Sequence, residues 1–151
     1  MRRESGGQSS GLEPMTTPCP CGRTAVRATQ TAQKSQHRLF SACCGLYLNQ
    51  HVPAPDAEAL MRSRYTAFVL GRPDYLLATW HASTRPADLR LEPAAKWLGL
   101  EVRSHRVLDA DHAEVEFVAR CREASRATRL HERSRFVRES GCWCYVDGDQ
   151  F

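Results

Sequence analysis

The spacing of apolar positions along the chain changes from a helical to a strand period near Trp97. After Asp56, apolar side chains recur at intervals of three and four residues, which predicts a helix with one buried face. The residues that share this face are Ala57, Leu60, Met61, Arg64, Tyr65, Phe68 and Val69. Asp56 can cap the start of the helix and Gly71 can end it. A second, shorter helix is predicted from a cap at Asp74 to Trp80.

Downstream of Trp97 the period is two. Residues 113–122 alternate apolar and polar side chains, which is typical of a half-buried strand. Residues 97–108 and 130–138 are predicted as strands on either side of it, and a turn at 139–141 leads to a last strand from Cys142. Helices followed by a strand meander predict an α+β domain with two N-terminal helices packed on an antiparallel sheet of about four strands.

The first third of the chain lacks this periodicity. Residues 1–18 are rich in Gly, Ser, Pro and Thr, which predicts a disordered tail. Residues 19–52 contain four cysteines and a polar stretch with too few large apolar side chains for a core of its own. We therefore divide the chain into a tail, a cysteine element at 19–52, and an α+β domain at 53–151.

Composition and charge limit the cellular compartment and the classes of partner that we expect for this protein. The hydrophobic fraction is 42%, the charged fraction 25% and the net charge +4, which is too small to indicate a nucleic-acid partner. No apolar run approaches the roughly 18 residues of a membrane span. The basic start is not followed by the apolar segment of a secretory signal. We expect a cytoplasmic protein without membrane attachment.

The cysteines carry the strongest chemical signal. Reducing cytoplasm disfavours disulfides, so clustered cysteines there indicate metal or redox chemistry. Cys19 and Cys21 form one pair, Cys43 and Cys44 a second, and a glycine follows each pair. Four thiolates are the preferred ligands of structural zinc, and they also serve iron. We predict that these four cysteines bind zinc, with iron, a Cys-x-Cys redox pair and replacement of one ligand by His37 as alternatives.

These residues carry a family resemblance. The cysteine pairs with their glycines resemble the SEC-C motif, a small zinc-binding element at the tail of the bacterial protein-export motor ATPase. Further motifs resemble the YchJ-like family of uncharacterised bacterial proteins: Ala59–Tyr65, Thr79-Trp80-His81, Ser83–Pro86, Trp97–Leu100, His131–Phe136 and Tyr145–Gly148. The resemblance implies a nuclear-transport-factor-two-like (NTF2-like) fold, a curved sheet and helices forming a cone. The loop from residue 22 to residue 42 is longer than is usual in this family.

A cone of this kind would have a pocket near the end of the second helix. Trp80 and His81 would lie at its mouth, and Glu132 would face inward if its strand face is the concave one. A buried carboxylate needs a partner, which Arg62 or Arg64 on the first helix could provide. The alternative for these residues is structural: a packed tryptophan, a histidine at a helix end and an ion pair.

Three functions compete. We favour a non-enzymatic zinc-binding adaptor that docks a partner protein through its cysteine element, because no local catalytic constellation stands out. The alternative is a cone domain that binds or converts a small molecule, with a purely structural zinc clip. Nucleic-acid binding is least favoured; it would use a basic strand pair containing Arg126, Arg129, Arg133, Arg135 and Arg138.

Overall fold

The computed structural model describes residues 17–24 and 36–151. The predicted disordered tail at 1–18 lies outside the described residues except for its last two positions. The middle of the enlarged loop, residues 25–35, also lies outside them.

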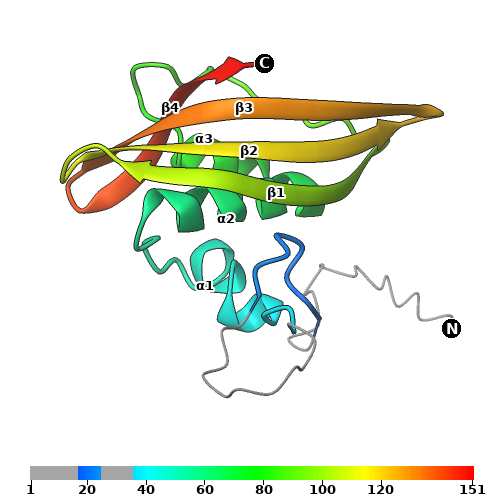
Figure 1. The fold of residues 1–151 in the computed structure, drawn as a ribbon, viewed down its shortest axis with the longest axis horizontal. Coiled ribbons are helices and arrows are strands. Elements are labelled where there is room, and N and C mark those ends of the chain that lie inside the picture. The colour runs from blue at the N-terminus through cyan, green and yellow to red at the C-terminus, as the bar shows by residue number, and fades with distance from the viewer. Residues whose placement is uncertain (1–16, 25–35) are drawn as a thin grey trace, which may run out of the picture.

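Short helices precede a four-stranded sheet (Figure 1). The elements in chain order are the 3₁₀ helix η1 (Phe40–Ala42), α1 (Gly45–Leu48), α2 (Ala57–Leu70), α3 (Pro73–Ala78), β1 (Ala95–Val107), β2 (His112–Glu123), β3 (Arg126–Glu139) and β4 (Cys142–Gln150). The strands are antiparallel in the order β1-β2-β3-β4 and curve over α2 and α3. This confirms the predicted α+β class.

The ends of α2 follow from its capping residues. The Asp56 side chain accepts a hydrogen bond of 2.7 Å from the backbone N–H of Ala59. At the other end Gly71 adopts φ 68°, a left-handed conformation that glycine reaches without steric cost. Both predicted ends of this helix are confirmed.

The prediction for α3 is wrong at both ends. The helix begins at Pro73 rather than after Asp74, because proline lacks the N–H that the first helical position leaves unused. It ends at Ala78, since the following residues run beside β4 instead. There Trp80 forms a parallel bridge with Tyr145, and the N–H of His81 donates to the Tyr145 carbonyl at 2.7 Å.

Bulges and a tight turn shape the sheet. The β1–β2 register shifts twice, between Trp97 and Gly99 and again between Val102 and Ser104, and such bulges bend a strand. β3 and β4 join through Ser140 and Gly141, both with positive φ (51° and 77°), as a two-residue hairpin turn of this type requires. The turn predicted at 139–141 is therefore confirmed.

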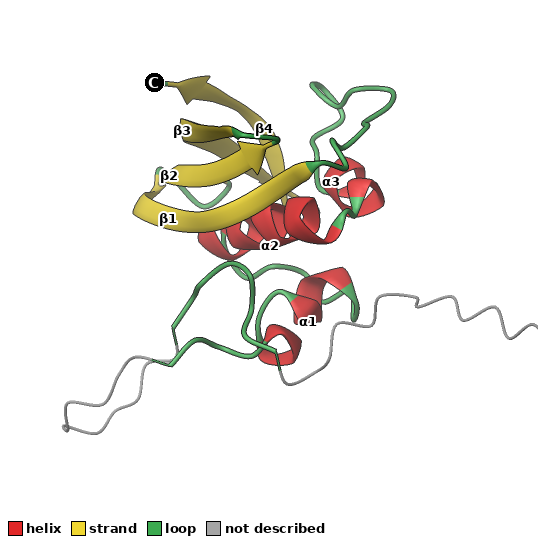
Figure 2. Ribbon diagram, turned by 90° about the vertical axis from the view of Figure 1, so that its right-hand side faces the viewer, coloured by secondary structure: helices red, strands yellow, loops and turns green. Residues whose placement is uncertain are grey.

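Helix α2 separates two parts of the molecule. Figures 1 and 2 show the sheet on one side of α2, and the cysteine segments with α1 on the other. The buried cores of the two parts are continuous, because the four cysteines pack in one cluster with residues of α2 and the sheet. Within the described residues, no helix is long and apolar enough to cross a membrane.

Candidate functional site

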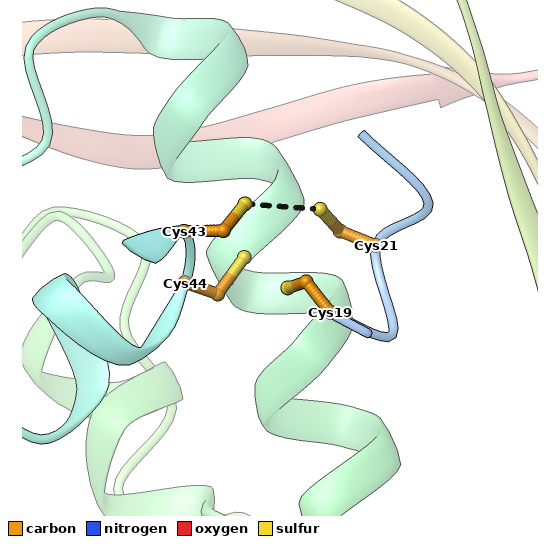
Figure 3. Close-up of side chains that lie close together, drawn as sticks. All are labelled: Cys19, Cys21, Cys43 and Cys44. Carbon is orange, nitrogen blue, oxygen red and sulfur yellow. Dashed lines mark hydrogen bonds between the residues drawn. The ribbon is translucent and has the colours of Figure 1, made fainter. Parts of the chain in front are cut away.

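The four predicted cysteines come together beside α2. Their sulfur atoms all lie within 4.8 Å of one another, with the Cys21 and Cys43 sulfurs 3.6 Å apart. Figure 3 shows the four side chains converging from two separate segments. A tetrahedral ion with metal–sulfur bonds of about 2.3 Å needs sulfur–sulfur edges of about 3.8 Å. The donor set and its spacing therefore fit one tetrahedral metal ion.

Backbone hydrogen bonds position the two cysteine segments. The Cys19 N–H donates to the Arg38 carbonyl at 2.8 Å, and the Phe40 N–H donates to the Thr17 carbonyl at 2.8 Å. Thr24 and His37 form an isolated bridge that joins the ends of the enlarged loop. This bridge and the Cys19–Arg38 hydrogen bond hold the two cysteine segments side by side. His37 is exposed and is not part of the cluster, so among the described residues the ligand set is four cysteines.

The glycine after the second pair is required by packing. A Cβ added to Gly45 would lie 2.6 Å from the carbonyl oxygen of Phe40. The Cys43 N–H donates to this same carbonyl at 3.0 Å. Gly45 therefore lets η1 approach closely enough to aim Cys43 and Cys44 at the first pair.

One stripe of α2 faces the cysteines. Arg62 donates to the carbonyl of Cys21 at 3.0 Å and pairs with Glu58, which also pairs with Arg23 at 3.4 Å. The hydroxyl of Thr66 lies 3.9 Å from the Cys19 sulfur. Two cations thus lie near a site that four thiolates and one divalent ion would leave negatively charged.

The thiols influence one another's protonation. Hydrogen bonds from the other three cysteines lower the pKa of Cys19. The pKa of Cys21 is lowered to about 7; its hydrogen bond with Cys19 raises it, but those with Cys43 and Cys44 lower it further. Hydrogen bonds with the first pair raise the pKa of Cys43 and of Cys44. A metal ion entering this cluster would displace protons from the second pair, so its affinity would fall on acidification.

A cavity lies on the opposite side of α2, under the sheet. Its volume is about 260 Å³ and its walls are mainly aromatic and aliphatic. The lining residues are Met61, Arg64, Tyr65, Phe68, Trp80, Trp97, Phe117, Ala119, Leu130, Glu132, Ser134, Phe136 and Tyr145. Three of the predicted pocket residues, Arg64, Trp80 and Glu132, therefore meet in one cavity.

Each of the two charged residues in this cavity has neutral partners. Glu132 is 8% exposed, and its Oε1 accepts hydrogen bonds from Ser134 at 2.8 Å and from Tyr145 at 3.1 Å. Arg64 donates to the Leu76 carbonyl and to the Thr79 hydroxyl, both at 2.7 Å. Burial lowers the pKa of Arg64 to about 10 and raises that of Tyr145. No ion pair within 4.0 Å joins Glu132 to any described residue; its interaction with Arg64, which counteracts the lowering of the Arg64 pKa, acts at longer range.

The other two predicted pocket residues lie outside the cavity. Arg62 faces the cysteines. Residues two positions apart on a helix point in directions about 200° apart, so Arg62 lies opposite Arg64, which faces the sheet. The ring of His81 bridges Ser83 at 2.6 Å and Glu139 at 2.8 Å on the exposed side of the loop beside β4. Its neighbour Trp80 points inward, as alternation in an extended segment requires.

Two residues that contact Glu132, Tyr145 and Gly148, were not among the predicted pocket residues. Tyr145 supplies a hydroxyl to Glu132, and a Cβ added to Gly148 would lie 2.6 Å from the carboxyl carbon of Glu132. Both lie on β4, whose register with β3 is shifted near Phe136 by a bulge. Alternation counted from Cys142 places Tyr145 on the same face as Trp143, but the extra residue Val146 moves Gly148 onto that face as well, which the count could not show.

Most of the basic strand pair is neutralised by acidic neighbours. Arg133 pairs with Glu116 at 3.8 Å, and Arg138 pairs with Asp111 at 3.4 Å. Arg135 pairs with two aspartates on β4, the closer contact being 2.6 Å. These contacts favour a structural role for three of the five arginines.

Comparisons with known proteins agree with this architecture. The family model described as "YchJ, middle NTF2-like domain" matches residues 56–148. A UPF0225 protein of Polaromonas naphthalenivorans is 78% identical over 91% of this chain and all of its own, and one of Methylibium petroleiphilum is 57% identical over 87% of this chain and 88% of its own.

Two solved structures are similar over most of the chain. A solution structure of a SEC-C motif containing protein from Rhodopseudomonas palustris has a TM-score of 0.71 at 27% identity, covering 89% of this chain and 99% of its own. A crystal structure of a SEC-C motif containing protein from Psychrobacter arcticus has a TM-score of 0.66 at 32% identity, covering 88% and 82%. The family match, the UPF0225 relatives and the shared fold show that this chain belongs to the YchJ-like (UPF0225) family.

Proposed function

We propose that this protein is a binding protein in which a zinc clip is structural and the cavity under the sheet holds a small organic molecule. The observation that carries the proposal is the cavity itself, which contains a buried carboxylate with no ion pair in the described part of the chain. Apolar walls with a few placed polar groups are the usual composition of a ligand site. We infer that ligand binding, rather than metal chemistry, is the activity of the domain.

The burial of the cysteines supports a structural metal. Their side chains are at most 5% exposed, so an ion held by all four would keep no open position for substrate or water. Zinc is the metal we propose, because it favours tetrahedral thiolate ligands and is not redox-active. We place the protein in the cytoplasm, where reducing conditions keep free thiols available.

Protein-observed NMR with a library of small organic fragments tests the cavity. We expect binders that shift the indole N–H signals of Trp80 and Trp97, since both side chains line the cavity. Replacing the half-buried Leu130 by Trp should fill the space and abolish these shifts. Fragments that bind equally well to Leu130→Trp would show that they bind elsewhere and would contradict the proposal.

Protein docking by the cysteine element is a second candidate. Two large apolar side chains of this element, Leu39 and Val52, are 44% and 43% exposed. The two similar solved structures are of SEC-C motif containing proteins, and the cysteine pairs of this chain resemble that motif, which also occurs at the tail of the bacterial protein-export motor ATPase. The exposed apolar pair could contact a partner once the metal has ordered the element.

Capture experiments test this docking role. We expect the immobilised metal-loaded protein to retain a partner from bacterial lysate, and a chelator or the double change Leu39→Ser and Val52→Ser to release it. The matched control is Leu98→Ser, an equally exposed leucine on β1. Capture that survives chelation unchanged would remove the docking role.

A further inference from the structure

We propose that the ligand of the cavity is an amine with an aromatic body, and that its ammonium group pairs with Glu132. This inference rests on the cavity being the binding site proposed above. It specifies which class of molecule enters the cavity and which residue selects it.

The hydrogen bonds of Glu132 leave one oxygen available. Ser134 and Tyr145 both donate to Oε1, and no described residue donates a side-chain or backbone hydrogen bond to Oε2. Burying a carboxylate without a cation is costly, so a cationic N–H donor from a ligand would gain a strong, charge-assisted hydrogen bond. Ser134, Tyr145 and the close backbone at Gly148 hold the carboxylate in place before any ligand arrives.

The walls of the cavity suit an aromatic body. Trp97 lies 5.7 Å from Tyr65 and 5.5 Å from Phe68, measured between ring centres. Tyr145 lies 5.2 Å from Trp80 and 5.9 Å from Phe136. Aromatic rings gain from edge and face contacts with another ring, and their faces attract cations. A ligand that carries both an aromatic ring and an ammonium group matches both properties of these walls.

The cation already present in the cavity, Arg64, has no ion pair with Glu132 within 4.0 Å and is attracted to it only at longer range. Two hydrogen bonds from Nη1 of Arg64 go to the Leu76 carbonyl and the Thr79 hydroxyl at the end of α3. Its guanidinium also lies over the rings of Trp80 and Tyr145, at 5.1 Å and 4.6 Å. Arg64 thus has neutral acceptors and aromatic faces, whereas Glu132 has no cation within 4.0 Å among the described residues. Neither Arg64 nor Glu132 has an opposite charge within 4.0 Å among the described residues, and the Glu132 oxygen that accepts no hydrogen bond is the atom to which a cationic ligand would donate.

Three probes of matched shape test this inference on the full chain. Benzylamine, benzyl alcohol and benzoate differ only in the group that would meet Glu132. We expect benzylamine to bind with the highest affinity in NMR titrations that follow the Trp80 and Trp97 indole signals. Glu132→Gln should weaken benzylamine roughly 10- to 150-fold, the effect of losing a charged hydrogen bond, and leave benzyl alcohol nearly unchanged.

A second variant tests whether benzylamine is held by direct contact with Glu132 or only by the general negative charge of the protein. Glu116→Gln removes one carboxylate from the neighbouring strand, where Glu116 pairs with His131 and Arg133 outside the cavity. It should leave benzylamine affinity within about twofold of the wild-type value.

The outcomes distinguish this inference from the proposal on which it rests. Tighter binding of benzoate or benzyl alcohol at the same indole signals would overturn the amine class and keep the cavity as a ligand site. Equal loss in Glu132→Gln and Glu116→Gln would show nonspecific attraction and overturn it as well. Absence of binding by all three probes, and by the fragment library, would overturn both.

Discussion

Cys44→Ser is expected to remove the bound metal and to unfold the cysteine element. Cys44 is 1% exposed and its sulfur lies within 4.8 Å of the other three. A structural zinc site contributes roughly 10–16 kcal/mol to folding, and serine is a far poorer ligand than a thiolate. The helices of the cysteine element, η1 and α1, are only three and four residues long and are not stable without the metal-bound segments, so we expect residues before α2 to become accessible while the sheet stays folded.

Elemental analysis, native mass spectrometry and limited proteolysis measure this result. The wild-type protein should carry one zinc ion per chain, and Cys44→Ser only a small fraction of that amount. Proteases should cut the variant before Asp56 far faster than the wild type. Cys142→Ser, at an exposed cysteine on β4, is the matched control and should change neither quantity.

Two outcomes would change this interpretation of the metal site. Iron in place of zinc would keep the site and overturn the choice of metal. A Cys44→Ser protein that retains one tightly bound ion and full resistance to proteolysis would show that Cys44 is not a ligand.

Gly148→Ala is expected to destabilise the domain by disturbing the cavity. The added Cβ would lie 2.6 Å from the carboxyl carbon of Glu132 and 2.8 Å from its Cγ, so either the side chain or β4 must move. Overpacking of this kind costs about 1–3 kcal/mol. Moving Glu132 would also disturb its hydrogen bonds with Ser134 and Tyr145.

Urea denaturation measures the cost, and a double-mutant cycle assigns it. Gly99→Ala is the matched control, since a Cβ there would meet no atom within 4 Å. If Glu132 is the obstacle, Gly148→Ala should cost much less in a Glu132→Ala background than in the wild type. An equal cost in both backgrounds would place the strain in the β4 backbone instead.

The features that could be predicted from the sequence depend on local signals. Asp56 and Gly71 mark the ends of α2 because capping is decided within one turn. The cysteine pairs indicated a metal site because four thiolates in two close pairs have few other uses in a reducing compartment. Family resemblance added the curvature of the sheet, which alternation alone could not supply.

The features that were missed depend on contacts between distant segments. The apolar stripe of α2 predicted one buried face, but the cysteine element covers a second one, where small side chains such as Ala59, Ser63 and Thr66 are also buried. Small side chains contribute little to the spacing of apolar residues along α2, so this second buried face could not be predicted from that spacing. The prediction of both Arg62 and Arg64 in the pocket had a different cause, since helical spacing alone places their side chains about 200° apart and only one of them can face the sheet.

The long outer strand β1 has a consequence for how the protein behaves at high concentration. Its outer edge pairs with no other strand in the described part of the chain, and such an edge can recruit a second sheet. The two bulges of β1 interrupt the regular row of N–H and C=O groups along this edge. The exposed positive charges of Lys96, Arg103 and Arg106 would repel the same strand of a second molecule. The strand that curves the wall of the cavity is therefore also protected against edge-to-edge aggregation.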